Sequence, residues 1–142
     1  MLFARGSEAV AALAGQWRWP HFSVAELACK CGGRFCDGAY WHAPDFLDGL
    51  EAMRVRVGRP LVINSGHRCA QWNAAVGGAA LSRHKQIAAD ISLRGHDRFR
   101  LRSAAQAAGF ARLGLARSFL HVDCRAWPAT WYYQGSESLW QR

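Results

Sequence analysis

Two short segments of the sequence each combine an imidazole with a carboxylate. The first runs from Ser82 to Asp90 and contains His84, and the second ends with His121 and Asp123. Two imidazoles and one carboxylate are a ligand set of catalytic zinc, which leaves its fourth position to water. The sequence therefore offers His84, Asp90 and His121 as candidate zinc ligands. The alternative is that they are ordinary surface polar groups, because short motifs also arise by chance.

The alternation of polar and apolar residues predicts that each segment lies partly in a β-strand. Successive side chains of a strand face opposite sides, so Asp90 shares a face with Ser92, and His121 shares a face with Asp123. The residues on the opposite faces are apolar: Ala89, Ile91, Leu93, Leu120 and Val122. Each strand is thus expected to contribute one face to the core and the other to a site.

The rest of the pattern predicts a single α+β domain. Helices are expected at 23–29, 44–57, 71–76 and 98–108, and short strands at 61–63, 88–93, 119–124 and 131–133. Gly114 is expected to mark a turn before the strand at 119–124. Residues 1–20 are weakly patterned, so we expect an N-terminal extension at 1–20 and the zinc-binding domain at 21–142.

Composition and charge narrow the class of protein. The chain has 142 residues, of which 51% are hydrophobic, and this excludes a disordered chain. It has no apolar run of about 18 residues and no recognisable secretory signal, so we expect no membrane span and synthesis in the cytoplasm. The net charge of +8 suits an anionic partner such as a cell-wall polymer or nucleic acid. The arginines are spread along the chain, so a solubilising surface explains them equally well.

The five cysteines do not form a regular disulfide pattern. Cys29, Cys31 and Cys36 cluster, whereas Cys69 and Cys124 stand apart in the sequence. A structural zinc site usually has four ligands in paired short spacings, and this cluster has three with no clear fourth. We therefore expect one disulfide within the cluster or free thiols, with a second metal site as the alternative.

Several other residues are candidates for substrate contacts or proton transfer. Arg68 could bind a carboxylate through its bidentate fork, or form a surface salt bridge. Asp123 could be a general base, a carboxylate that orients a ligand, or a cap of the strand end, and His67 could replace one of the zinc ligands. Four C-terminal aromatic residues could line a groove, although we expect edge or core packing: Trp127, Trp131, Tyr132 and Tyr133.

The order of the motifs is more specific than any one of them. Along the chain come Ser65-Gly-His-Arg68, Asn73 with Val76-Gly-Gly78, Ser82-Arg-His84, Ala88-Ala-Asp-Ile91 and Phe119-Leu-His-Val-Asp123. This order resembles the zinc D-alanyl-D-alanine carboxypeptidase family, which includes endopeptidases of peptidoglycan and is close in fold to the metal-binding domain of hedgehog. The resemblance covers roughly residues 20 to 135 and implies a small, mainly antiparallel sheet with flanking helices.

The resemblance also implies roles for single residues. His84, Asp90 and His121 match the zinc ligands of the family, and Arg68 matches its substrate-anchoring arginine. We also expect Ser82 to contact the substrate. Relatives carry an acidic residue or a histidine two or three positions before the last zinc ligand, where this chain has Ser118 and Phe119. Asp123 therefore becomes the best candidate for the proton carrier.

The expected function is zinc-dependent hydrolysis of amide bonds in the peptide stems of peptidoglycan, as a D,D-carboxypeptidase or an endopeptidase. A phage endolysin or a virion-associated enzyme, with phage structural proteins as partners, would need no secretion signal.

The alternative is a non-catalytic cell-wall-docking or phage-tail module of the same fold. It is favoured by the loop between His84 and Asp90, which has one residue fewer than is usual and Ile87 where glycine is common. Nucleic-acid binding has only the positive charge in its favour.

Overall fold

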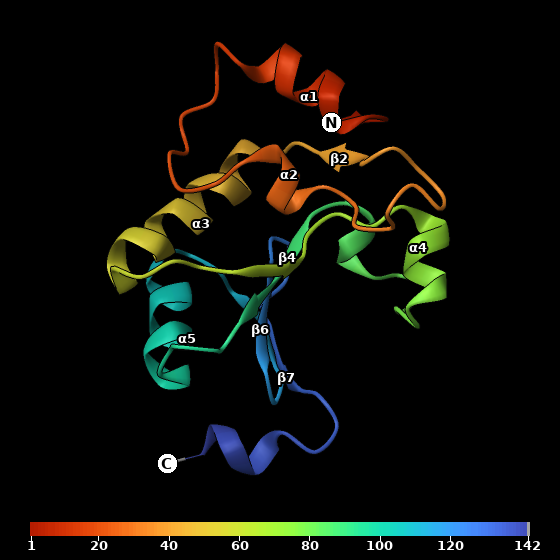
Figure 1. Ribbon diagram of the computed structural model, residues 1–142. Coiled ribbons are helices and arrows are strands. Elements are labelled where there is room, and N and C mark those ends of the chain that lie inside the picture. The colour runs from red at the N-terminus through yellow and green to blue at the C-terminus, as the bar shows by residue number, and fades with distance from the viewer. Residues whose placement is uncertain (142) are drawn as a thin grey trace.

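A five-stranded sheet carries both polar segments (Figure 1). The computed structural model describes residues 1–141. The order across the sheet is β3 (Ile63–Ser65), β4 (Ala88–Ser92), β6 (Phe119–Asp123), β5 (Arg112–Leu115) and β7 (Ala129–Tyr132). Neighbouring strands are antiparallel except β5 and β7, which are parallel. The predicted mainly antiparallel sheet is therefore confirmed.

Helices and a small second sheet surround these strands. The helices are α1 (Gly6–Leu13), α2 (Val24–Leu27), α3 (Pro44–Val57), α4 (Ala70–Ala75) and α5 (Arg98–Ala107), with 3-10 turns η1 (Arg83–Lys85) and η2 (Glu137–Trp140). The second sheet pairs β1 (Leu2–Phe3) with β2 (Tyr40–Trp41). In Figure 1, α3 and α5 lie together on one side of the large sheet, and α4 lies on the other side of the molecule. The α+β class predicted from the sequence is thus confirmed.

The apolar face of the large sheet forms the core with α3 and α5. Ile91, Leu120 and Val122 are fully buried there, and Leu50 of α3 and Leu101 of α5 belong to the same cluster. Burying a side chain of this size stabilises a fold by about 1.5–3 kcal/mol. The alternation read from the sequence therefore fixes which face of β4 and β6 is left for polar groups.

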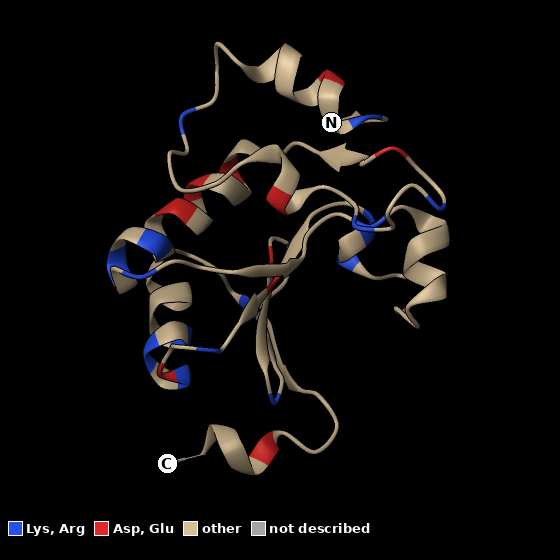
Figure 2. Ribbon diagram, viewed as in Figure 1, with Lys and Arg blue, Asp and Glu red and all other residues tan. Residues whose placement is uncertain are grey.

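Charge is ordered along α3. Asp45, Asp48 and Glu51 precede Arg54 and Arg56, which lie in its last turn (Figure 2). Acidic groups near the start of a helix and basic groups near its end complement the helix dipole. Elsewhere Figure 2 shows Lys and Arg distributed over several elements, α5 among them, as the spread of arginines in the sequence predicts.

Two predictions, the strand at 61–63 and the turn at Gly114, need correction. The strand expected at 61–63 lies at Ile63–Ser65, where it pairs with β4, while Leu61 is buried in the core just before it. Gly114 does not mark a turn but lies within β5. A Cβ atom at Gly114 would lie 2.8 Å from the rings of Trp131 and Tyr133, so glycine is required there by packing and not by a turn.

The N-terminal residues pack on the rest of the chain. Phe3, Ala9, Leu13 and Trp19 belong to the main hydrophobic core, and β1 pairs with β2. Ser23 and Glu26 form a capping box at the start of α2. None of the helices within residues 1–141 has the length and apolar character that a membrane span requires.

The segment after β3 lies directly against α2. The amide of His67 donates to the carbonyl oxygen of Leu27 at 2.8 Å. A Cβ atom on the preceding Gly66 would lie only 2.4 Å from that oxygen and 2.7 Å from the Leu27 Cα. Backbone atoms cannot move aside as a flexible side chain can, so the residue at 66 must be glycine for this contact to form.

We therefore expect Gly66→Ala to destabilise the fold. Overpacking of this kind typically costs about 1–3 kcal/mol, and urea unfolding would show a lower midpoint. Gly15→Ala is the matched control, because no atom lies within 4 Å of its added Cβ and its free energy of unfolding should change by less than about 0.5 kcal/mol. Equal midpoints for the two variants would contradict the close contact with Leu27.

Candidate metal centre and substrate pocket

One row of residues across the sheet carries the centre of the site. Asp90 on β4 lies directly opposite His121 on β6. The same row includes Ser65 on β3, Gly114 on β5 and Trp131 on β7. Residues opposite one another in a sheet point to the same face. The polar face predicted for β4 and β6 is thus extended by a hydroxyl on one side and an indole on the other.

His84 reaches this row from the 3-10 turn before β4. Its Nδ1 lies 2.7 Å from the carbonyl oxygen of Gly66, which can only accept, so Nδ1 carries the hydrogen. Its Nε2 faces Asp90 Oδ1 at 3.1 Å. The hydroxyl oxygen of Ser82 accepts from the His84 amide at 3.2 Å and caps the turn. The short loop, with Ile87 buried in the core, therefore still brings His84 to Asp90.

His121 lies between two carboxylates. Its Nδ1 lies 2.9 Å from Asp90 Oδ1, and its Nε2 donates to Asp123 Oδ2 at 2.8 Å. Burial disfavours the charged ring, but the hydrogen bonds to Asp123 and Asp90 outweigh it and raise the pKa of His121. Burial would likewise raise the pKa of Asp90, yet its hydrogen bonds from His121 and His84 hold that pKa well below its usual range.

The geometry of these three side chains fits a metal ion. One ligand atom from each of His84, Asp90 and His121 lies within 4.8 Å of the other two, and all three side chains are buried. The remaining nitrogen of each ring already has a fixed acceptor, Gly66 O for His84 and Asp123 for His121. Partners of this kind set the tautomer of a ligating histidine. His84 Nε2 and His121 Nδ1 are therefore the atoms that would bind the ion.

Asp123 is held in place from three sides. Its Oδ1 accepts from Arg112 Nε at 2.9 Å and from the Arg125 amide at 3.0 Å, and its Oδ2 accepts from His121. Burial alone would raise the pKa of Asp123, but the hydrogen bonds from His121 and Arg125 keep it at about 2. Asp123 is therefore an ionised carboxylate whose exposed fraction is only 2%.

Arg68 lies beside the three candidate ligands. Its Nε donates to Ser65 Oγ at 3.0 Å, its Nη1 donates to Asn73 Oδ1 at 3.2 Å, and its Nη2 lies 3.5 Å from Asp90 Oδ2. Asn73 is itself held by a hydrogen bond from its Nδ2 to the carbonyl oxygen of Ala79. The guanidinium is thus fixed at the side of the site, with Nη2 pointing towards the carboxylate.

A pocket of about 430 Å³ opens over this arrangement. It is lined by the three candidate ligands and, among others, by Arg68, Ser82, Arg83, Arg112, Asp123, Arg125, Trp131 and Tyr133. Within residues 1–141, Asp90 and Asp123 are the acidic residues of this lining, against four arginines. The pocket therefore favours an anionic group, such as a peptide carboxylate.

Two of the four C-terminal aromatic residues line the pocket, although edge or core packing was expected for all four. The ring centroid of Trp131 lies 5.3 Å from that of His121, and Gly114 leaves the space for this approach. Tyr133 lines the pocket beside it, and desolvation raises its pKa to about 12, so its phenol can donate a hydrogen bond at neutral pH. Trp127 and Tyr132 do face outward, with exposed fractions of 61% and 42%.

His67 lies outside the group that could bind the ion. Its Nδ1 donates to the carbonyl oxygen of Gln86 at 2.6 Å, and the ring is buried away from the pocket lining. Ser65 and Asn73, by contrast, hold Arg68 at the site without having been singled out as site residues from the sequence. The presence of Ser65 and Asn73 in the ordered motifs was the one signal that could have identified them.

The cysteines also differ from the expected pattern. All five are free thiols, which is one of the two states expected from the sequence, the other being a single disulfide within the cluster. Cys69, which stands apart in the sequence, lies with Cys29, Cys31 and Cys36, and the four sulfur atoms are within 4.8 Å of one another. The expectation of no fourth sulfur was therefore wrong, because the fourth comes from a segment 33 residues after Cys36.

The sequence was compared with models of known protein families and with curated proteins. A family model described as peptidase M15 matches residues 20–124. The matched span contains Arg68, His84, Asp90 and His121, and it ends one residue after Asp123. Strand β7, with Trp131, follows the matched span. No curated protein matches the chain.

The first prediction for this site concerns its metal content. Replacing His121 by alanine should remove one equivalent of zinc per chain, because it deletes one ligand and the hydrogen bond that links Asp123 to the site. Elemental analysis of protein dialysed against zinc-free buffer measures this. His21→Ala is the control, since His21 pairs with Glu51 at the surface. Unchanged zinc content in His121→Ala would mean that this group does not bind the ion.

Proposed function

Because the chain belongs to the M15 peptidase family, we propose that it is a zinc-dependent peptidase that hydrolyses amide bonds in the peptide stems of peptidoglycan. The observation that carries the proposal is the convergence of His84 Nε2 and His121 Nδ1 on one oxygen of Asp90, inside a pocket that also holds Arg68. Two imidazoles and one carboxylate leave a fourth position open, as catalytic zinc sites do.

We propose that His84, Asp90 and His121 hold zinc, which supplies Lewis acidity and lowers the pKa of water to about 7. Gly66 and Asp123 keep the two rings in the tautomers that this requires. Ser82 supports the same geometry, because its hydroxyl caps the turn that carries His84. Its hydroxyl hydrogen remains available to a substrate in the pocket.

Arg68 is the proposed anchor of the substrate carboxylate. Its guanidinium is fixed by Ser65 and Asn73, so less conformational entropy is lost when a carboxylate binds. A planar guanidinium binds a carboxylate through two parallel hydrogen bonds. The phenol of Tyr133, protonated at neutral pH, is a second donor on the same pocket wall. Both a D,D-carboxypeptidase and an endopeptidase fit this arrangement, and the net charge of +8 suits the anionic cell wall as the place of action.

We propose that Asp123 acts mainly as a positioning residue for His121. From the sequence it was the best candidate for the proton carrier, with orientation of a ligand as an alternative. Both of its oxygens accept hydrogen bonds from protein donors, and its pKa of about 2 makes it a weak base. A general base works best when its pKa lies near the operating pH. These contacts therefore favour a role for Asp123 in orienting His121 over a role in proton transfer.

The proposed activity is tested directly on purified peptidoglycan. We expect the zinc-loaded protein to cleave a single type of amide bond, and mass spectrometry of the released fragments and the residual muropeptides would show which bond is cut. The double variant His84→Ala/His121→Ala should be inactive under the same conditions. A zinc-loaded wild-type protein that leaves every muropeptide intact would contradict the proposal and favour a module that docks without cleaving.

Asp123→Asn separates positioning from proton transfer. We expect zinc affinity to fall about 10–100-fold, because the amide can no longer give His121 a charged partner, while the rate per zinc-loaded enzyme falls less than tenfold. Competition with a chelator measures the affinity, and hydrolysis at saturating zinc measures the rate. If Asp123 instead carries the proton, the rate of the loaded variant would fall by about 10²–10⁴ with little change in zinc affinity.

A further inference from the structure

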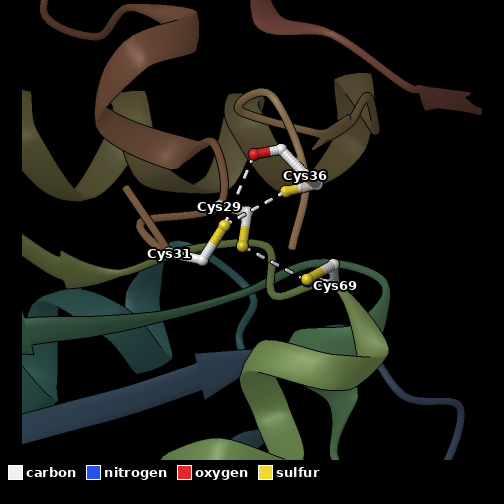
Figure 3. A group of neighbouring side chains, drawn as sticks. All are labelled: Cys29, Cys31, Cys36 and Cys69. Carbon is white, nitrogen blue, oxygen red and sulfur yellow. Dashed lines mark hydrogen bonds between the residues drawn. The ribbon is translucent and has the colours of Figure 1, made fainter. Parts of the chain in front are cut away.

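Four cysteine sulfurs converge on one point away from the pocket (Figure 3). Cys29 and Cys31 follow α2, Cys36 lies in the next loop, and Cys69 immediately precedes α4. All four Sγ atoms lie within 4.8 Å of one another. Figure 3 shows the side chains pointing towards a common centre from two segments that are far apart in the sequence.

The sulfur separations match a tetrahedral metal site better than a disulfide. Zinc binds thiolate at about 2.3 Å, and a regular tetrahedron with that bond length places its sulfurs about 3.8 Å apart. The Sγ atoms of Cys31 and Cys36 are 3.6 Å apart. A disulfide would require about 2.05 Å. The arrangement therefore leaves room for an ion between the sulfurs.

Backbone groups around the cluster are placed to support thiolates. The amide of Cys69 donates to Cys29 Sγ at 3.4 Å, and the amide of Trp72 donates to Cys69 Sγ at 3.4 Å. Hydrogen bonds to a charged acceptor stabilise its charge. The thiol of Cys31 contacts the Cys36 carbonyl oxygen at 3.5 Å, and binding of an ion would release the thiol proton.

The loop between the ligands is built to return on itself. Gly32 and Gly33 have φ of 68° and 85°, in the left-handed region that favours glycine. These two residues turn the chain so that Cys36 comes back to Cys31. Cys29 and Cys31 are buried, and Cys36 and Cys69 are half-buried, so the centre of the cluster is largely enclosed.

We propose that Cys29, Cys31, Cys36 and Cys69 bind a second zinc ion with a structural role. Four thiolates fill all four positions of a tetrahedral ion and leave none for water or substrate, which is the arrangement of structural and not of catalytic zinc. The ion would join the loop after α2 to the residue next to Arg68. It would thereby hold the segment that carries the proposed substrate anchor.

Zinc stoichiometry tests the second site independently of the peptidase activity. Protein purified under reducing conditions should contain two zinc ions per chain. His84→Ala/His121→Ala should retain one, and cobalt in that variant should give the intense near-ultraviolet absorption of thiolate-to-cobalt charge transfer. Wild-type protein loaded with cobalt should show the same absorption if the double variant does not fold.

Cys69→Ser should bind one zinc fewer than wild type and lose the thiolate-to-cobalt absorption. Cys124→Ser is the matched control, since Cys124 is exposed and lies outside the cluster, and it should retain both ions. One zinc in the wild type that is lost with the two histidines would overturn the inference and leave the proposed function intact. A Cys31–Cys36 disulfide in the freshly purified protein, or iron in place of zinc, would also overturn it.

Discussion

The register between β4 and β6 is the constraint on which the site depends. Asp90 faces His121 across the two strands, while Ile91 and Leu120 face each other on the opposite, apolar side. A slip of one residue would turn every side chain of a strand to the other face, burying the polar groups in the core and exposing the apolar ones. Burial of Ile91 and Leu120 therefore also places the candidate metal ligands.

A network of buried charged side chains extends from Asp90 through His121 and Asp123 to Arg112. His121 is shared by Asp90 and Asp123, and Arg112 pairs with Asp123. Removing one member of such a buried network leaves the others unpaired, which typically costs about 3–5 kcal/mol. Arg112 lies opposite Asp123 in the sheet, so this pair follows from the same strand pairing that aligns the row of Asp90 and His121. The strand pairing that aligns Asp90 with His121 therefore also brings together the charged groups that stabilise them.

The segment from Ser65 to Cys69 connects the two candidate metal sites. Arg68 lines the pocket and donates a hydrogen bond to Ser65, whereas Cys69 belongs to the cysteine cluster. Gly66 lies between them, in contact with Leu27 on one side and with His84 on the other. Because this short segment has fixed contacts at every position, a change at the cysteine cluster has a direct structural route to Arg68.

The sequence by itself determined the α+β class, the polar faces of β4 and β6, and His84, Asp90 and His121 as a possible ligand set. These features depend on local periodicity and on the order of short motifs. Only the tertiary structure decided which residues join them from a distance. Cys69 completes the cysteine cluster and Trp131 reaches His121 over Gly114, because long-range packing brings together segments whose separation along the chain carries no sign of their contact.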